Sequence, residues 1–369
     1  MVPQAGAKEL RLEGATPVAT MYAVYTLLEK LGCGFYLGGD TLPPRRVPLL
    51  VPADLDLRLK PTFRIRGSLP WYNFLNSPTT WNYEDYKQFF DQMAKQKCNF
   101  VGFHSYDSEP FAAYESEGKL RSGSPLVGAS NYGWGTVKGL KTSEFGFGTG
   151  QFFDTEDFAA DATLVKGDDA AKIRSCQELL RKSLAYAKSR GIKTCLGFEV
   201  SGDPTDPDEQ RRFAERLRQL LEDYPALDYV WIWQPESLGG RGWSVPQPDT
   251  SFAKLVREHF ATFAYLGSQE RIVEAARVTG YMRLADELRK QFAPEVQLAV
   301  AGWGGDRWMR FTDFFAGFDK VLPPGVIFAA LDNIDPPRQK GVSEVYSQVK
   351  HHEVWPIPWF EFDGDQWFP

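Results

Sequence analysis

The sequence is poor in the residues that metal enzymes and redox proteins use. Among its 369 residues are four cysteines and four histidines. Cys33, Cys98, Cys176 and Cys195 form no C-x-x-C pair, so we expect buried free thiols. A metal hydrolase usually needs several His and Asp ligands, which so few histidines do not favour. We therefore expect no metal and no other cofactor.

Charge of one sign and long apolar runs are also scarce. Lys+Arg 42 against Asp+Glu 48 gives a formal net charge of -6, and neither sign forms long runs. The sequence therefore predicts no binding to nucleic acid or to an anionic membrane. No stretch approaches the ~18 consecutive apolar residues of a membrane-spanning helix. The first ten residues lack the apolar segment of a signal peptide.

Two common catalytic loops are missing as well. A serine nucleophile would need a G-x-S-x-G elbow, which the sequence does not contain. GFGTG at 146–150 has glycine spacing loosely like that of a phosphate loop. No strand precedes it and no Lys-Ser/Thr follows, so we interpret it as a flexible loop. His351 and His352 are most simply the end of a solvated helix.

From Pro61 onward, strands and helices alternate. Seven such repeats predict a parallel sheet with helices between its strands. Doubly wound and barrel folds both fit, and the strand number and polar strand ends favour a TIM (β/α)8-type barrel. A closed barrel needs an eighth strand, so we predict a barrel that lacks its last βα unit. The expected strands are 63–69, 99–106, 193–200, 227–236, 296–305, 326–334 and 354–365; the expected helices are 83–98, 170–191, 206–225, 251–293, 306–321 and 342–352.

The residues before the barrel predict the C-terminal part of a small α/β domain. Residues 8–12 and 34–37 are predicted strands, with apolar residues at helical spacing between them. The proline-rich stretch 41–52 is typical of a linker. We therefore divide the chain into a domain remnant with its linker, 1–52, and an incomplete barrel, 53–369. Within the barrel, the long stretch 107–168 is predicted to be an active-site lid or wall.

Carboxylates follow several of the predicted strands. In a TIM barrel the active site forms at the carboxyl ends of the strands, and glycoside hydrolysis needs two carboxyl groups flanking the scissile bond. Glu236 is the candidate acid and Glu361 the candidate nucleophile or base. Asp332 would assist or replace Glu361.

Strand alternation groups these carboxylates with their neighbours. Glu361 shares a face with Ile357, Asp332 with Ala330, and Glu236 with Ile232 and Gln234, and we expect these rows to point inward. Flat rings and polar groups beside them suit a sugar. The expected substrate contacts are Arg66, His104, Tyr106, Glu199, Trp233, Trp303, Asn333 and Trp359.

GATPVATMYAVYTLLEKLGCGFYLGGDTLP (14–43) resembles the last helix and strand of the small α/β domain that precedes the barrel in α-glucuronidases and β-N-acetylhexosaminidases. PTFRIRG (61–67) resembles the start of their catalytic barrel. The resemblance is sharpest over 13–67 and implies a shared domain arrangement, a carbohydrate substrate and an extracellular or periplasmic location.

The resemblance also implies roles for single residues. Glu236 matches the strand-four general acid of α-glucuronidases, and Asp332 and Glu361 match their strand-six and strand-seven carboxylates. Pro235 stands where β-N-acetylhexosaminidases have the Asp of an Asp-Glu pair, which argues against their substrate-assisted mechanism. Retention and inversion both stay open.

The sequence therefore predicts a glycoside hydrolase acting on a glycan that contains uronic acid or N-acetylhexosamine. The first alternative is a non-catalytic carbohydrate-binding protein on a degenerate glycosidase barrel. The carboxylates at the strand ends oppose it. A second alternative, a metal-dependent hydrolase or lyase on the same scaffold, is opposed by the low histidine count.

Overall fold

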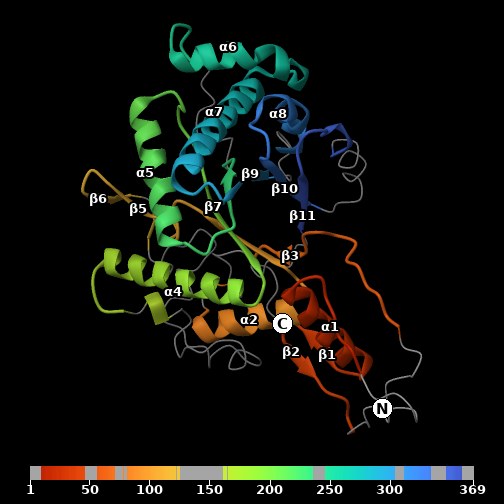
Figure 1. The fold of residues 1–369 in the computed structure, drawn as a ribbon. Coiled ribbons are helices and arrows are strands. Elements are labelled where there is room, and N and C mark those ends of the chain that lie inside the picture. Colours follow the sequence, from red (N-terminus) through yellow and green to blue (C-terminus); the bar gives the residue numbers. More distant parts are fainter. Residues whose placement is uncertain are drawn as a thin grey trace.

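The centre of the protein is a parallel β-sheet of seven strands, seen in a computed structural model (Figure 1). The strand order is β11-β10-β9-β8-β7-β4-β3. The structure describes residues 10–45, 56–70, 78, 81–121, 123–124, 161–163, 165–235, 246–303, 311–333 and 346–359, with no side-chain description at 163, 303, 332, 333, 358 and 359.

Each strand of this sheet pairs in parallel with the next sheet strand along the chain. A doubly wound sheet would instead reverse its strand order at a switch point. The winding is therefore that of a TIM-like α/β fold, which is the one of the two expected folds that the strand number and the polar strand ends favoured. The strands are β3 (Gly67–Ser68), β4 (Phe100–Ser105), β7 (Lys193–Glu199), β8 (Tyr229–Trp233), β9 (Gln297–Trp303), β10 (Ile327–Asn333) and β11 (Val354–Trp359).

Helices connect the strands, and side-chain caps begin several of them. Asp168 accepts a hydrogen bond from the Ala171 amide, and Asp206 accepts from the Asp208 and Glu209 amides. Such caps satisfy amide groups that have no partner inside the helix. The helices are α2 (Tyr83–Lys95), α4 (Asp169–Ser189), α5 (Pro207–Asp223), α6 (Ser251–Phe263), α7 (Gln269–Phe292) and α8 (Phe315–Val321), with short 3-10 turns η4 (Asp161–Thr163), η5 (Ala264–Leu266) and η6 (Phe311–Phe314).

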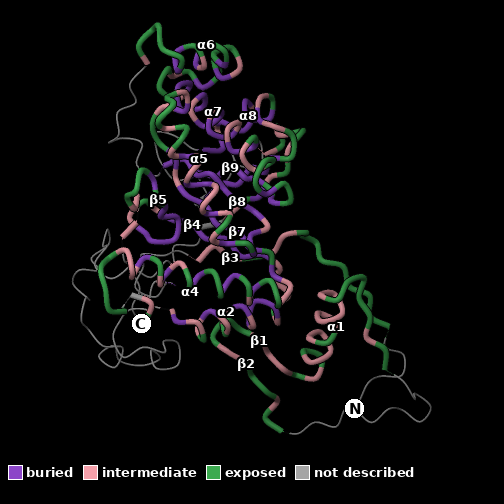
Figure 2. Tube along the Cα trace, turned by 60° about the vertical axis from the view of Figure 1, so that its left-hand side comes forward, coloured by how far each residue is buried: buried purple, intermediate pink, exposed green. Residues whose placement is uncertain are grey.

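The two faces of the sheet belong to different apolar clusters. Val101, Phe103 and Ile232 pack in the larger cluster with residues of the helices. Phe100 and Trp231 belong to a second cluster made almost entirely of strand residues. The helices therefore cover the outer face, and the second cluster fills the interior. Figure 2 shows the central strands of the sheet, among them β4, β7 and β8, in the colour of buried residues.

The sheet is strongly curled. The rings of Phe100 on β4 and Trp355 on β11 lie 5.1 Å apart between centroids, although β10, β9, β8 and β7 lie between the two strands in the sheet. Such a contact requires the sheet to bend round on itself. The guanidinium of Arg64, before β3, also contacts the carboxylate of Glu353, before β11. The two edge strands thus approach at their amino-terminal ends, and the described residues form a curled, barrel-like sheet.

The N-terminal segment packs on the helical layer. It comprises α1 (Pro17–Lys30) and a hairpin of β1 (Gly34–Tyr36) and β2 (Gly39–Thr41). The Tyr22 hydroxyl donates to the Cys98 carbonyl at 3.0 Å, and Lys97 pairs with Glu29. The strand predicted at 34–37 is confirmed, whereas residues 10–12 form no strand.

Two further predictions changed in detail. The stretch 107–168 contains a hairpin of β5 (Tyr114–Ser116) and β6 (Lys119–Arg121), together with η4. The helical segment 251–293 divides at Gly267, whose positive φ of 68° ends η5 before α7 begins. Among the described helices, none is long and apolar enough to cross a membrane.

Candidate functional site

Four of the predicted substrate contacts come together at the carboxyl ends of β4, β7 and β8. His104 Nε2 lies 3.6 Å from Glu199 Oε1. The His104 ring meets Tyr106 edge-on at 4.4 Å and Trp233 at 4.8 Å between centroids. Glu199 is also the register partner of Trp233. The cluster thus joins a carboxylate, an imidazole and two aromatic rings on the inner face of the sheet.

The members of this cluster differ in accessibility. His104 and Trp233 are fully buried. Tyr106 is half-buried, and the Glu199 side chain keeps 12% of its surface exposed. His104 and Trp233 therefore form the floor of the site, and Tyr106 and Glu199 are the members that a ligand can reach.

Two glycines make room for Trp231 beneath the site. A Cβ at Gly102 would lie 2.2 Å from the Trp231 ring, and a Cβ at Gly197 would lie 1.8 Å from the Trp231 carbonyl oxygen. The Trp231 indole donates to the Phe103 carbonyl at 2.8 Å and meets Trp233 edge-on. Glycines on two neighbouring strands thus let one indole fill the interior directly below His104 and Glu199.

Glu109 is a site residue that the sequence analysis missed. Its side chain is 1% exposed, in the turn that follows β4. Glu109 Oε2 accepts from the Tyr106 amide at 3.0 Å, and the Glu109 amide donates to the Tyr106 carbonyl at 3.0 Å. Only this reciprocal pairing reveals its importance, and no local sequence pattern marks it.

Burial sets the electrostatics of Glu109. Burial raises the pKa of the Glu109 carboxyl well above its usual range, the hydrogen bond from Tyr106 opposes this, and the charge of Glu199 raises the pKa further. The site therefore combines a buried carboxyl whose pKa is raised with a second, more exposed carboxyl, that of Glu199.

Arg216 of α5 fixes the same turn from outside. Its guanidinium pairs with Asp107 at 2.9 Å and donates to the Ala112 carbonyl at 3.0 Å. It also lies over the Phe198 ring, 4.1 Å from the centroid. A helix on the outer layer thus holds the loop that carries Tyr106.

Arg66 lies elsewhere than predicted. Its guanidinium donates to the Lys97 and Phe63 carbonyls, and its backbone precedes the first paired residue, Gly67. The paired part of this strand is shorter than the sequence suggested, so Arg66 sits at the amino-terminal end of the sheet. This is the end opposite to His104 and Glu199.

The predicted inward rows need correction on two strands. Ile232 and Ala330, grouped above with Glu236 and Asp332, pack in the helix-facing cluster. Gln234 is buried and its amide donates to Glu274 of α7 at 3.4 Å. On β11 the position of Ile357 agrees with the predicted inward row, because Ile357 packs against the interior cluster.

The remaining candidates are described only in part. Glu236 and Glu361 lie outside the described residues. The backbone places Trp303, Asp332, Asn333 and Trp359 at the carboxyl ends of β9, β10 and β11, with Trp303 paired to Leu331 and Asn333 paired to Trp359. Only the backbone is described at these four positions, and their contacts with a substrate stay predictions.

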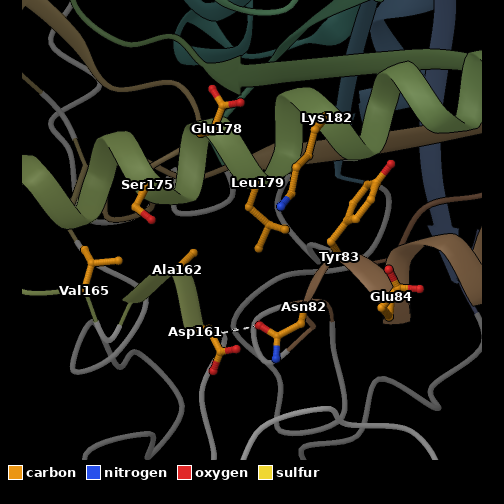
Figure 3. Close-up of a pocket in the computed structure, with 10 residues that line it drawn as sticks. All are labelled: Asn82, Tyr83, Glu84, Asp161, Ala162, Val165, Ser175, Glu178, Leu179 and Lys182. Atoms are coloured by element: carbon orange, nitrogen blue, oxygen red, sulfur yellow. Dashed lines mark hydrogen bonds between the residues drawn. The ribbon is translucent and has the colours of Figure 1, made fainter.

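A cavity of about 380 Å³ lies apart from this cluster, between α2, α4 and η4 (Figure 3). Lys182 lies over the Tyr83 ring at 4.6 Å, and Asn82 accepts from the Asp161 amide at 2.8 Å. None of the candidate residues that the structure describes lines it. Within the described part of the chain, no group of three or more His, Cys, Asp or Glu side chains is placed to hold a metal ion.

No family model and no characterised protein sequence matches this chain. Among solved structures it overlaps the GH20 catalytic modules of the pneumococcal exo-β-D-N-acetylglucosaminidase StrH, with a TM-score of 0.36, 9% identity and coverage of 73% of this chain and 60% of that one. It also overlaps a Thermobaculum terrenum O-GlcNAc hydrolase mutant, with a TM-score of 0.41, 9% identity and coverage of 80% and 47%. The chain thus spans about half to three fifths of those structures, and overlaps this loose carry no argument about its activity.

Proposed function

We propose that the protein is a glycoside hydrolase acting on a glycan that contains uronic acid or N-acetylhexosamine. The cluster at the carboxyl ends of β4, β7 and β8 supports this proposal best. There Glu199 and the Tyr106 ring reach the accessible surface above a buried floor of His104 and Trp233. A carboxylate beside a flat ring suits a sugar, whose hydroxyls need polar partners and whose C–H face needs an apolar one.

In this proposal the carboxylates predicted from the sequence carry the chemistry. Glu236, three residues beyond the last residue of β8, protonates the leaving oxygen. Glu361 attacks the anomeric carbon or activates water, with Asp332 assisting. Glu199, beside His104, binds substrate hydroxyls. The curled parallel sheet supports these roles because the carboxyl ends of its strands all lie at the same end of the sheet.

The test is hydrolysis of a panel of aryl glycosides, including glucuronides and N-acetylhexosaminides, by the protein and by its Glu236→Gln variant. General acid catalysis contributes roughly 10²- to 10⁴-fold, so kcat/KM should fall by that order for substrates with poor leaving groups. Glu295→Gln is the matched control, because Glu295 is exposed just before the amino-terminal end of β9.

The panel separates the proposed function from its rivals. Turnover of one substrate that collapses in Glu236→Gln and survives in Glu295→Gln supports a glycosidase and names its sugar. Saturable glycan binding without turnover would contradict catalysis and favour a carbohydrate-binding protein. Full activity of both Glu236→Gln and Glu361→Gln would remove these residues from the mechanism.

A further inference from the structure

The turn after β4 is closed by a carboxyl group that solvent does not reach. Two hydrogen bonds join Tyr106 and Glu109. The Tyr106 amide donates to the Glu109 carboxyl, and the Glu109 amide donates to the Tyr106 carbonyl. The arrangement resembles the reciprocal pairing of a helix capping box. It fixes the backbone at the point where the chain leaves the strand, and so fixes where the Tyr106 ring lies.

No cation in the described part of the chain balances Glu109. Among the described residues it takes part in no salt bridge, and its Oε1 atom is buried without a hydrogen-bond partner. Arg216 pairs with Asp107 through Nη1 and donates to the Ala112 carbonyl through Nε, and within the described residues no ion pair joins it to Glu109. A buried, unpaired carboxylate is costly, and such a group takes up a proton instead. The charge of Glu199 acts in the same direction.

The turn directs the Tyr106 ring toward the site. Tyr106 contacts His104 at 4.4 Å between ring centroids, and His104 in turn approaches Glu199. Tyr106 is half-buried, whereas Glu109 behind it is not accessible. Glu109 therefore acts on a ligand only through Tyr106.

We propose that Glu109 is a positioning residue, whose uncharged carboxyl closes the turn at the end of β4 and holds the Tyr106 ring in place for the ligand. The inference rests on the proposed function for the identity of that ligand. The state of the carboxyl and the geometry of the turn do not depend on it.

Two substitutions separate an uncharged acceptor from a charged one. Glu109→Gln keeps a neutral side chain of the same length, with an oxygen that can accept from the Tyr106 amide. Glu109→Ala removes the acceptor. We expect Glu109→Gln to keep KM within about twofold of the wild type, and Glu109→Ala to raise KM by roughly three- to tenfold, the worth of one hydrogen bond, with a smaller change in kcat. Glu115→Gln and Glu115→Ala, on the exposed position of β5, are the matched controls.

The protonation state is read without any substrate. In protein labelled with ¹³C at the glutamate carboxyl carbons, the Glu109 signal is the one that disappears in Glu109→Gln. At pH 7 we expect it at the chemical shift of an un-ionised carboxyl, while exposed glutamates show the ionised value. The Tyr106 amide signal should move strongly in Glu109→Ala and little in Glu109→Gln.

Each outcome decides a separate question. An ionised Glu109 signal at pH 7, or a KM in Glu109→Gln as high as that in Glu109→Ala, would overturn the neutral carboxyl. An unchanged KM and an unmoved Tyr106 amide in Glu109→Ala would overturn the positioning role. Absence of turnover in the wild type would overturn the proposed function alone, since the carboxyl and amide signals still decide the state of Glu109 and of its turn.

Discussion

The buried ion pair of α7 gives a sharp test of the electrostatics behind the sheet. Glu274 is fully buried, contacts the Arg277 guanidinium and accepts from the Gln234 amide. Burial raises the pKa of the Glu274 carboxyl, while the charge of Arg277 and the hydrogen bonds from Gln234 and Arg277 oppose the rise. Arg277→Met removes the principal opposing charge and keeps much of the side-chain volume, so the pKa of Glu274 should rise further.

The consequence for stability has a definite sign. A buried acid with a raised pKa holds its proton in the folded state at pH values where the unfolded chain, with a pKa of ~4.3, has lost it. The contribution of Glu274 to stability is fully present below the unfolded pKa of ~4.3 and is lost as pH rises from there through the folded pKa. The penalty of Arg277→Met should therefore be about 1 kcal/mol near pH 5 and grow toward ~3–5 kcal/mol at pH 8, where an unpaired charge must be buried. The growth cannot exceed ~1.4 kcal/mol per pH unit.

Urea unfolding of the wild type and Arg277→Met at pH 5, 6, 7 and 8 measures this growth. Glu274→Gln is the control background, because it cannot ionise: there Arg277→Met should cost the same at every pH. A penalty in the single variant that stays constant from pH 5 to pH 8 would refute the reasoning and show that Glu274 does not depend on Arg277 for its charge.

Two further predictions concern the interior below the site. Gly197→Ala should lower the free energy of unfolding by about 1–3 kcal/mol or more, because its Cβ would meet the Trp231 backbone; Gly325→Ala, in open space at a φ of +87°, should cost only ~1 kcal/mol, and equal losses in urea unfolding would contradict the close approach. Trp233→Phe should lower the same free energy by about 2 kcal/mol and leave KM almost unchanged, because Trp233 is buried beneath the site; a large rise in KM with unchanged stability would instead mean that Trp233 touches the substrate.

The order of strands and helices was predictable because buried parallel strands are short apolar runs between polar helices. Segments such as LGF on β7 and VWIW on β8 fall within the expected ranges. Strand ends were less predictable: β8 ends at Trp233 rather than at residue 236, and only Gly67–Ser68 of the first strand is paired. That short pairing explains why Arg66 lies at the amino-terminal end of the sheet.

The direction of side chains was harder to predict than the strands themselves. In an α/β barrel both faces of a strand are buried, one by helices and one by the interior, so alternation shows no polar and apolar side. Ile232 and Trp233 are both fully buried on opposite faces. The sequence therefore gave no basis for choosing the row of Gln234 or that of Trp233. Glu109 was missed because its partner, Tyr106, is defined by the folded turn.

The agreement between chain order and strand order has a kinetic consequence. Each strand of the seven-stranded sheet pairs with the sheet strands nearest to it along the chain. The register partners are 26 residues apart between β10 and β11 (Phe328 and Val354) and 93 apart between β4 and β7 (Phe100 and Lys193), so the pairings that close the shorter loops should form first. The contact between Arg64 and Glu353 is different, because 289 residues separate its partners. It cannot form until the intervening strands have brought the two edges together, which makes it a late event and a marker of the completed curl.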